Sequence, residues 1–246
     1  MHLSRDRLDE GRDVVPAILE LIRERASVRA PFDVERPVSD KDMADILEAA
    51  RWSPTAHNMQ NLEVIVVDDP DTLAAISRIE RPISETFIRE NYQQLSFSEE
   101  KLLARKTGVM ATMFPPSWRD PEFSLDKLTA EEAAGMQRPL PASPVLLVVL
   151  YDPSRRAPAS EGDFLGVISL GCVMENIWLA AEALGIGLQI ISSLSSAPEM
   201  RQILSIPDKL VIAFTCRLGY PVAKPPIRLR VRRDVADFTH HNRFGD

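Results

Sequence analysis

Residues 227–233, IRLRVRR, alternate apolar and basic side chains near the C-terminus. In a strand, alternate side chains lie on opposite faces, so Arg228, Arg230 and Arg232 would share one face and repel one another. The whole chain has 29 basic and 36 acidic residues, for a formal net charge of −7. This acidic balance disfavours general binding to nucleic acid or anionic membranes, so the pattern predicts a compact anion as the partner of these arginines.

A second cationic motif, RASVR, lies at residues 25–29. Arg25 and Arg29 flank Ala26 and Ser27, which combines two forked donors, a hydroxyl group and a small residue whose backbone can approach an anion closely. This combination suits a phosphate group. Arginines near a helix end also commonly face solvent or offset the helix dipole, so the motif alone leaves both interpretations open.

The third polar motif is the stretch SPTAHNMQN between a predicted helix and a predicted buried strand. Its hydroxyl and carboxamide groups offer neutral donors and acceptors to a ligand that has hydroxyl groups and ring nitrogens. Turn formation alone would explain Pro54 and Asn58. Gln60 directly precedes the strand, so we expect its side chain to need a hydrogen-bond partner there.

The cysteines and histidines show no spacing typical of metal ligands, so no metal site is predicted. Cys172 and Cys216 lie in apolar runs and are expected to be buried free thiols, which suits a reducing cytoplasm. The charged start of the chain has no apolar run of the kind found in signal peptides. His57 is expected to hydrogen-bond or pack rather than to act as a base.

The elements that must position these motifs follow from apolar periodicity and from the capping and breaking residues. We predict helices at residues 14–25, 39–52, 71–79, 85–112, 163–184 and 198–204. We predict strands at residues 62–67, 145–150 and 188–193, and a fourth strand with a turn at residues 210–221. Pro16 is expected in the first turn of its helix, Ser39 at an N-cap and Pro198 at a first helical position. Glu175, Asn176 and Glu182 interrupt the apolar run at residues 164–184, which favours a buried helix over a membrane span.

Apolar strands separated by helices indicate an α+β or α/β protein whose sheet is covered on both faces. No change of composition marks a linker, so residues 1–246 are predicted to form a single domain. Residues 80–143, with several prolines and weak periodicity, would be a variable excursion from it. Residues 222–246 would form a C-terminal arm.

Four blocks of the chain, in this order and spacing, resemble the nitroreductase family of FMN-dependent oxidoreductases. They are RASVRAPF, ARWSPTAHNMQNLEVIVV, NIWLAAEALGIGLQIISSLS, and LGYP with RVRRDVADFTHHNRF. The resemblance implies an α+β fold with a central mixed or antiparallel sheet flanked by helices. It also implies an interlocked homodimer that holds two FMN molecules at the subunit interface and has a C-terminal arm.

The resemblance assigns FMN contacts to residues in four places: Arg25, Ala26, Ser27, Arg29, Pro54, Thr55, Asn58, Gln60, Ser192, Ser193, Arg230 and Arg232. The first group and the two arginines of the arm would hold the phosphate and the neighbouring flavin. The loop at 54–60 would contact the flavin, typically from the other subunit. The serine pair stands where the family presents backbone donors, and often an acidic side chain, to the reactive edge of the ring; an ordinary strand end is the alternative.

The implied function is an FMN-dependent NAD(P)H oxidoreductase that reduces small nitroaromatic, quinone or activated-alkene substrates in a ping-pong cycle. Hydride chemistry would occur at flavin N5, with no side chain assigned as catalytic, and NAD(P)H would bind transiently. Two alternatives stay open. The same fold could carry out reductive dehalogenation or flavin fragmentation, or a non-catalytic protein could use the basic arm for binding.

Overall fold

The structure, a computed structural model, describes residues 6–81, 86, 100, 104, 140–160, 162–195, 197–223 and 232–245. The chain divides into two compact units, residues 1–79 with 139–225, and residues 80–138 with 226–246. The predicted excursion and arm fall largely in the second unit, and the single domain stays a prediction. The helix at 85–112 lies outside the described residues apart from isolated positions. The basic strand at 227–232 lies outside them apart from Arg232.

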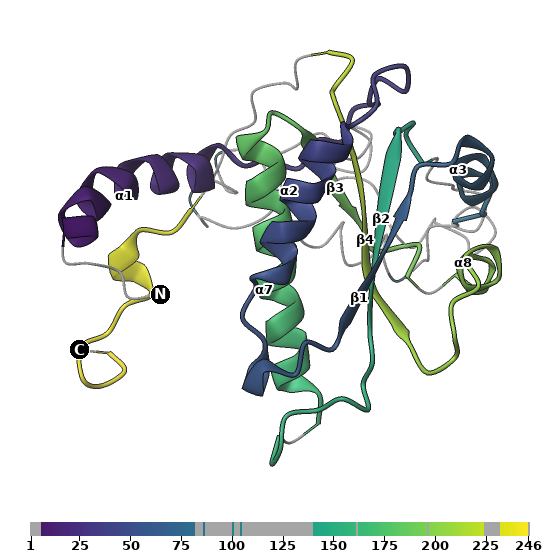
Figure 1. Ribbon diagram of the computed structural model, residues 1–246. Coiled ribbons are helices and arrows are strands. Elements are labelled where there is room, and N and C mark those ends of the chain that lie inside the picture. The colour runs from purple at the N-terminus through teal and green to yellow at the C-terminus, as the bar shows by residue number, and fades with distance from the viewer. Residues whose placement is uncertain are drawn as a thin grey trace. The chain divides into compact units, whose positions relative to one another are not determined.

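The first unit contains a four-stranded sheet in the order β1-β2-β4-β3, with every neighbouring pair antiparallel (Figure 1). The strands are β1 (Leu62–Val67), β2 (Val145–Tyr151), β3 (Gly187–Ile191) and β4 (Val211–Gly219). All four predicted strands are confirmed, although β3 ends two residues before the prediction. The sheet is therefore antiparallel over the part of the chain that the structure describes.

Helices cover both faces of this sheet (Figure 1). On one face lie α2 (Asp40–Arg51) and α7 (Phe164–Ala183), and on the other lie α3 (Pro70–Ser77) and α8 (Pro198–Ile203). The central strand β2 explains why both layers are needed. Its residues 145, 147 and 149 pack with α2 and α7, while residues 146, 148 and 150 pack with α3 and α8. A continuous apolar run thus supplies two cores.

The helix starts follow local capping chemistry. The Ser39 hydroxyl accepts a hydrogen bond of 3.1 Å from the Asp42 N–H, which confirms the predicted N-cap of α2. Pro198 stands in the first turn of α8, as predicted. Helix α1 (Asp6–Glu24), however, starts earlier than expected, so the placement of Pro16 in its first turn is wrong. Helix-forming residues before the proline extend α1, and the proline removes one backbone hydrogen bond within it.

Helix α7 meets the length and hydropathy of a membrane span, a test that core helices of soluble proteins also pass. Its buried side chains are Ser169, Leu170, Val173, Ile177 and Ala181. Phe164, Val167 and Ile168, near its start, are exposed. The prediction of a buried helix is therefore confirmed for one face and wrong for the outer face of the first turns.

Cys216 is fully buried in β4, and burial raises the pKa of its thiol to about 12. Only the thiolate is nucleophilic, so we expect a Cys172→Ser variant to show no thiol reaction with a disulfide reagent at pH 8 in the native state. One thiol per chain should react once guanidinium unfolds the protein. Rapid reaction of the folded variant would contradict this burial.

Candidate functional site

The cationic motif at residues 25–29 runs along the edge of the sheet. Ser27 forms a parallel bridge with Leu188 of β3. On the side of α7, the indole N–H of Trp178 donates to the Ala26 carbonyl at 3.3 Å. The motif is thus attached both to a strand and to a helix, which fixes the backbone that presents its side chains.

Arg25 is held against α7 by two contacts. Its Nε lies 3.1 Å from Glu175 Oε1, and its guanidinium carbon lies 4.6 Å from the centre of the Trp178 ring. The side chain is 22% exposed, and Nε has no well-aligned hydrogen-bond acceptor within the described residues. A guanidinium has five N–H donors, so Arg25 can keep this ion pair and still donate to an anion.

The remaining cations of the predicted site are less completely described. Arg29 is half-buried on the same segment as Arg25. Arg230 lies outside the described residues, and Arg232 belongs to the second unit of the chain. The convergence of the arm on residues 25–29 therefore stays a prediction.

The loop after α2 has an unusual backbone. His57, Asn58 and Gln60 have φ angles of 53°, 53° and 44°, in the left-handed region. Residues other than glycine rarely adopt this conformation, and asparagine tolerates it better than histidine or glutamine. Such strain persists where surrounding contacts enforce it, and it is concentrated at functional sites.

Contacts with α7 enforce this conformation. The Ser169 hydroxyl accepts a hydrogen bond of 3.0 Å from the Ala56 N–H, and Asn176 Nδ2 donates to Ser53 Oγ at 2.9 Å. Within the loop, the hydroxyl of Thr55 accepts from the backbone N–H of residue 60 at 3.1 Å. These hydrogen bonds hold the backbone of the loop against α7.

The exposure of the side chains in this loop differs from what the sequence predicts for Gln60. Pro54, Asn58 and Gln60 are exposed and Thr55 is half-buried, so the expectation that Gln60 needs a partner is wrong. The positive φ turns residue 60 outward, and the buried polar residue is Asn61, which is 5% exposed.

Thr55 and Gln60 of this loop line a cavity of about 210 Å³ between α2 and β1. Its lining is Leu47, Ala50, Arg51, Ser53, Thr55, Gln60, Leu62 and Val64.

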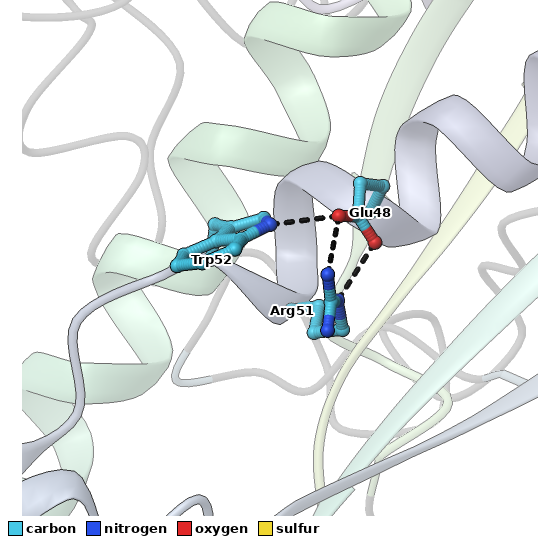
Figure 2. Close-up of polar contacts among 3 residues, drawn as sticks. All are labelled: Glu48, Arg51 and Trp52. Atoms are coloured by element: carbon cyan, nitrogen blue, oxygen red, sulfur yellow. Dashed lines mark hydrogen bonds and ion pairs between the residues drawn. The ribbon is translucent and has the colours of Figure 1, made fainter. Parts of the chain in front are cut away.

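A charged cluster precedes this loop at the end of α2 (Figure 2). Arg51 binds both carboxylate oxygens of Glu48 at 2.6 and 2.7 Å, and the indole N–H of Trp52 donates to the same carboxylate at 2.7 Å. The hydrogen bonds from Arg51 and Trp52 lower the pKa of Glu48. The cluster orients the Trp52 ring, which is 73% exposed, beside the start of the polar loop.

The left-handed backbone gives a testable prediction for stability. A His57→Gly variant should unfold at higher denaturant concentration, because glycine adopts a φ of 53° without strain, with a gain of up to about 1 kcal/mol. The matched control is Ala56→Gly at the adjacent position, where φ is not positive and glycine should destabilise by about 0.5–1 kcal/mol. Equal destabilisation of both variants in urea would show that His57 is not strained.

Ser192 and Ser193 follow the end of β3. Ser192 is exposed and its carbonyl accepts from the Ser195 N–H at 3.1 Å, while Ser193 is half-buried. The hydroxyl oxygen of Ser195 is buried and has no hydrogen-bond partner within the described residues. A buried hydroxyl in this condition is unfavourable and suits a position where a polar ligand approaches.

These residues fit an FMN molecule. A dianionic phosphate requires cations and N–H or O–H donors, which Arg25, Ser27 and Arg29 supply from one anchored segment. The flavin ring requires neutral donors, which the polar loop supplies. The two segments contact α7 at Trp178 and Ser169, about 13.5 Å apart along the helix axis at 1.5 Å per residue.

A sequence profile described as the Nitroreductase family matches residues 22–220 of the chain. The chain belongs to the nitroreductase family. The match contains both anchored segments, the serine pair and all four strands. The resemblance found in the sequence is therefore confirmed, together with its α+β fold.

Individual relatives within the family are distant. A putative NADH dehydrogenase/NAD(P)H nitroreductase from Archaeoglobus fulgidus is 26% identical over 82% of this chain and 84% of its own. An NADPH-flavin oxidoreductase from Vibrio harveyi is 29% identical over 46% of this chain, and the alignment spans only 50% of that relative. The crystal structure of a nitroreductase with bound FMN from Bacteroides fragilis is 20% identical, covers 91% of this chain and 98% of its own, and has a TM-score of 0.54.

Several residues that hold this nitroreductase-family site were missed in the sequence. Glu175 contacts Arg25 and Asn176 contacts Ser53, whereas the sequence analysis assigns these two polar residues no partner. Polar residues within an apolar helix were the available signal. Arg217, an arginine within an apolar strand, was a second signal of the same kind.

Proposed function

We propose that this nitroreductase-family protein binds FMN and uses NAD(P)H to reduce small nitroaromatic, quinone or activated-alkene substrates. Its cofactor is FMN, and it is an oxidoreductase. The observation that carries the proposal is the segment at 25–29, whose two arginines and serine are anchored on β3 and α7. The printed names of the relatives from V. harveyi and A. fulgidus support the nicotinamide donor, and the FMN bound in the B. fragilis protein supports the cofactor.

The residues of this chain have binding and orienting roles. Arg25, Ser27 and Arg29 hold the phosphate, and Glu175 keeps Arg25 in place. Arg29 also supplies positive charge toward the ring, which favours its reduced form. When bound, FMN would supply the redox chemistry that links NAD(P)H to the second substrate in a ping-pong cycle. The backbone at Ser192 and Ser193 orients the reactive edge of the ring.

The protein acts as a homodimer in this proposal. Helix α1 exposes apolar side chains along one stripe, namely Val14, Val15, Ile18, Leu19 and Ile22. The first turns of α7 expose three more apolar side chains. Apolar side chains grouped in this way favour burial against a second subunit. In the dimer that the resemblance implies, the loop at 54–60 would contact the flavin held by the partner subunit.

The chemistry also indicates where the protein works. A free buried thiol and a nicotinamide donor both suit the reducing cytoplasm. The partners in this proposal are the second subunit, FMN, NAD(P)H and a small electron acceptor.

Anaerobic reduction of the purified protein tests this function. We expect a yellow protein whose visible flavin absorbance is lost on addition of NADH or NADPH and restored by one equivalent of a quinone. If the protein contains flavin and neither NADH nor NADPH reduces it, the proposed oxidoreductase activity would be overturned. Colourless protein with steeply salt-dependent DNA binding would favour the binding-protein alternative.

A further inference from the structure

Arg217 is fully buried in the sheet. It lies in β4, between β2 and β3, in the apolar sequence VIAFTCRLG. A buried guanidinium is costly unless its donors are hydrogen-bonded. Its side chain lies on the face opposite the neighbouring Cys216 and Leu218, which belong to the core with α2 and α7.

The guanidinium has an acceptor for each of its five N–H groups. Nε donates to a side-chain amide of β3 at 2.8 Å, Nη1 to two carbonyls at 3.0 and 3.5 Å, and Nη2 to two carbonyls at 2.6 and 3.1 Å. In that order, these neutral oxygens belong to Gln189, Ala142, Pro141, Ala30 and Val28. Packing alone would not require five directed hydrogen bonds from one side chain.

One of these acceptors lies in the segment at 25–29 and another directly follows it. The carbonyls of Val28 and Ala30 flank Arg29 in the sequence, and both accept from the same Nη2. The Val28 N–H donates to the carbonyl of Leu188 at 2.9 Å, so this stretch follows a strand-like course beside β3. Backbone groups alternate in direction along such a stretch. Residues 28 and 30 therefore face Arg217, and the backbone groups of Ser27 and Arg29 face the opposite edge.

We propose that Arg217 is a positioning residue for the phosphate site. By fixing the carbonyls on both sides of Arg29, it sets the direction in which Ser27 and Arg29 present their donors, and so sets the affinity for the phosphate of the flavin. This inference rests on the proposed FMN function. It assigns Arg217 no contact with the cofactor.

The test compares FMN with riboflavin, which lacks the phosphate. Apoprotein is titrated with each flavin, and the quenching of flavin fluorescence gives the ratio of the two dissociation constants. We expect Arg217→Lys and Arg217→Met to lower the preference for FMN at least tenfold, since neither variant reproduces the fork that binds Val28 and Ala30. Gln189→Leu keeps Arg217 but removes its Nε acceptor, and should lower the preference about threefold. This variant decides the test if the Arg217 variants do not fold.

Arg201 provides the matched control. Its Nη2 likewise donates to two backbone carbonyls, those of Pro207 and Leu210, at 2.7 and 2.9 Å, but in the connection between α8 and β4. We expect Arg201→Met to lower the melting temperature and to leave the FMN preference within twofold of the unaltered protein. An unchanged preference in Arg217→Lys and Gln189→Leu, or an equal loss in Arg201→Met, would overturn the inference. Failure of the unaltered protein to bind either flavin would instead overturn the proposed function.

Discussion

A variant with both Arg25→Ala and Arg230→Ala is expected to purify without flavin. Each arginine contributes a charged hydrogen bond to the phosphate in this account, and such a bond is worth about 1.5–3 kcal/mol. The loss of two corresponds to a weakening of FMN binding by roughly 10²–10⁴-fold. The flavin content of the purified protein, measured from its absorbance, checks the result. The melting temperature should fall as well, because FMN stabilises only the folded state.

The ion pair of Arg25 with Glu175 allows a sharper version of this experiment. Removal of Arg25 alone leaves the carboxylate of Glu175 without this partner beside the phosphate site. An Arg25→Ala, Glu175→Gln variant should therefore bind FMN more tightly than Arg25→Ala alone. Arg78→Ala, on the exposed end of α3, is the control and should keep its flavin. Stoichiometric FMN in the Arg25→Ala, Arg230→Ala variant would refute the placement of the phosphate.

A Phe32→Ala variant is expected to lose about 3–5 kcal/mol of unfolding free energy. Phe32 is 1% exposed and lies three residues after Arg29, the last residue of the segment at 25–29. A Cβ atom added to Gly187 would lie 2.7 Å from the ring, and one added to Gly219 would lie 2.8 Å from the Phe32 Cβ. The Phe32 side chain therefore fills space that is open because residues 187 and 219 are glycines. Its packing there holds the stretch that follows the segment at 25–29 against the sheet.

The fit between ring and glycine can be tested from both sides. Gly187→Ala should destabilise by about 1–3 kcal/mol through overpacking. In the Phe32→Leu background the same substitution should cost less, because the smaller side chain gives room. Urea unfolding of the apoproteins measures the four free energies. Additive losses would show that the two residues do not compete for the same space.

The sequence predicted those elements whose signals are local. The run LEVIVV and the run VLLVVL became β1 and β2, and Ser39 capped α2, because short β-branched stretches and capping residues act within a few positions. The start of α1 differs from the prediction because a proline is favourable in a first helical turn but does not exclude a helix that begins before it. The outer face of α7 was missed because apolar periodicity does not show which faces stay exposed in one chain.

The assignment of FMN contacts to residues 25–29 and to the polar loop stays a prediction, and the residues that hold these two segments could not be read from the sequence. Arg25, Ser27 and the polar loop carry short motifs that a resemblance can identify. The contacts of Arg25 with Glu175 and of Val28 with Arg217 join residues far apart in the sequence. Such pairs depend on which strand and helix become neighbours, and no local pattern encodes that choice.

The affinity of the apoprotein for FMN relative to riboflavin tests the central claim most directly. The two flavins differ only in the phosphate, so the ratio of their dissociation constants isolates the contribution of the cations at 25–29 and of the arm. The account predicts that FMN binds at least about 100-fold more tightly, in keeping with two or more charged hydrogen bonds. Equal affinities for FMN and riboflavin would contradict it.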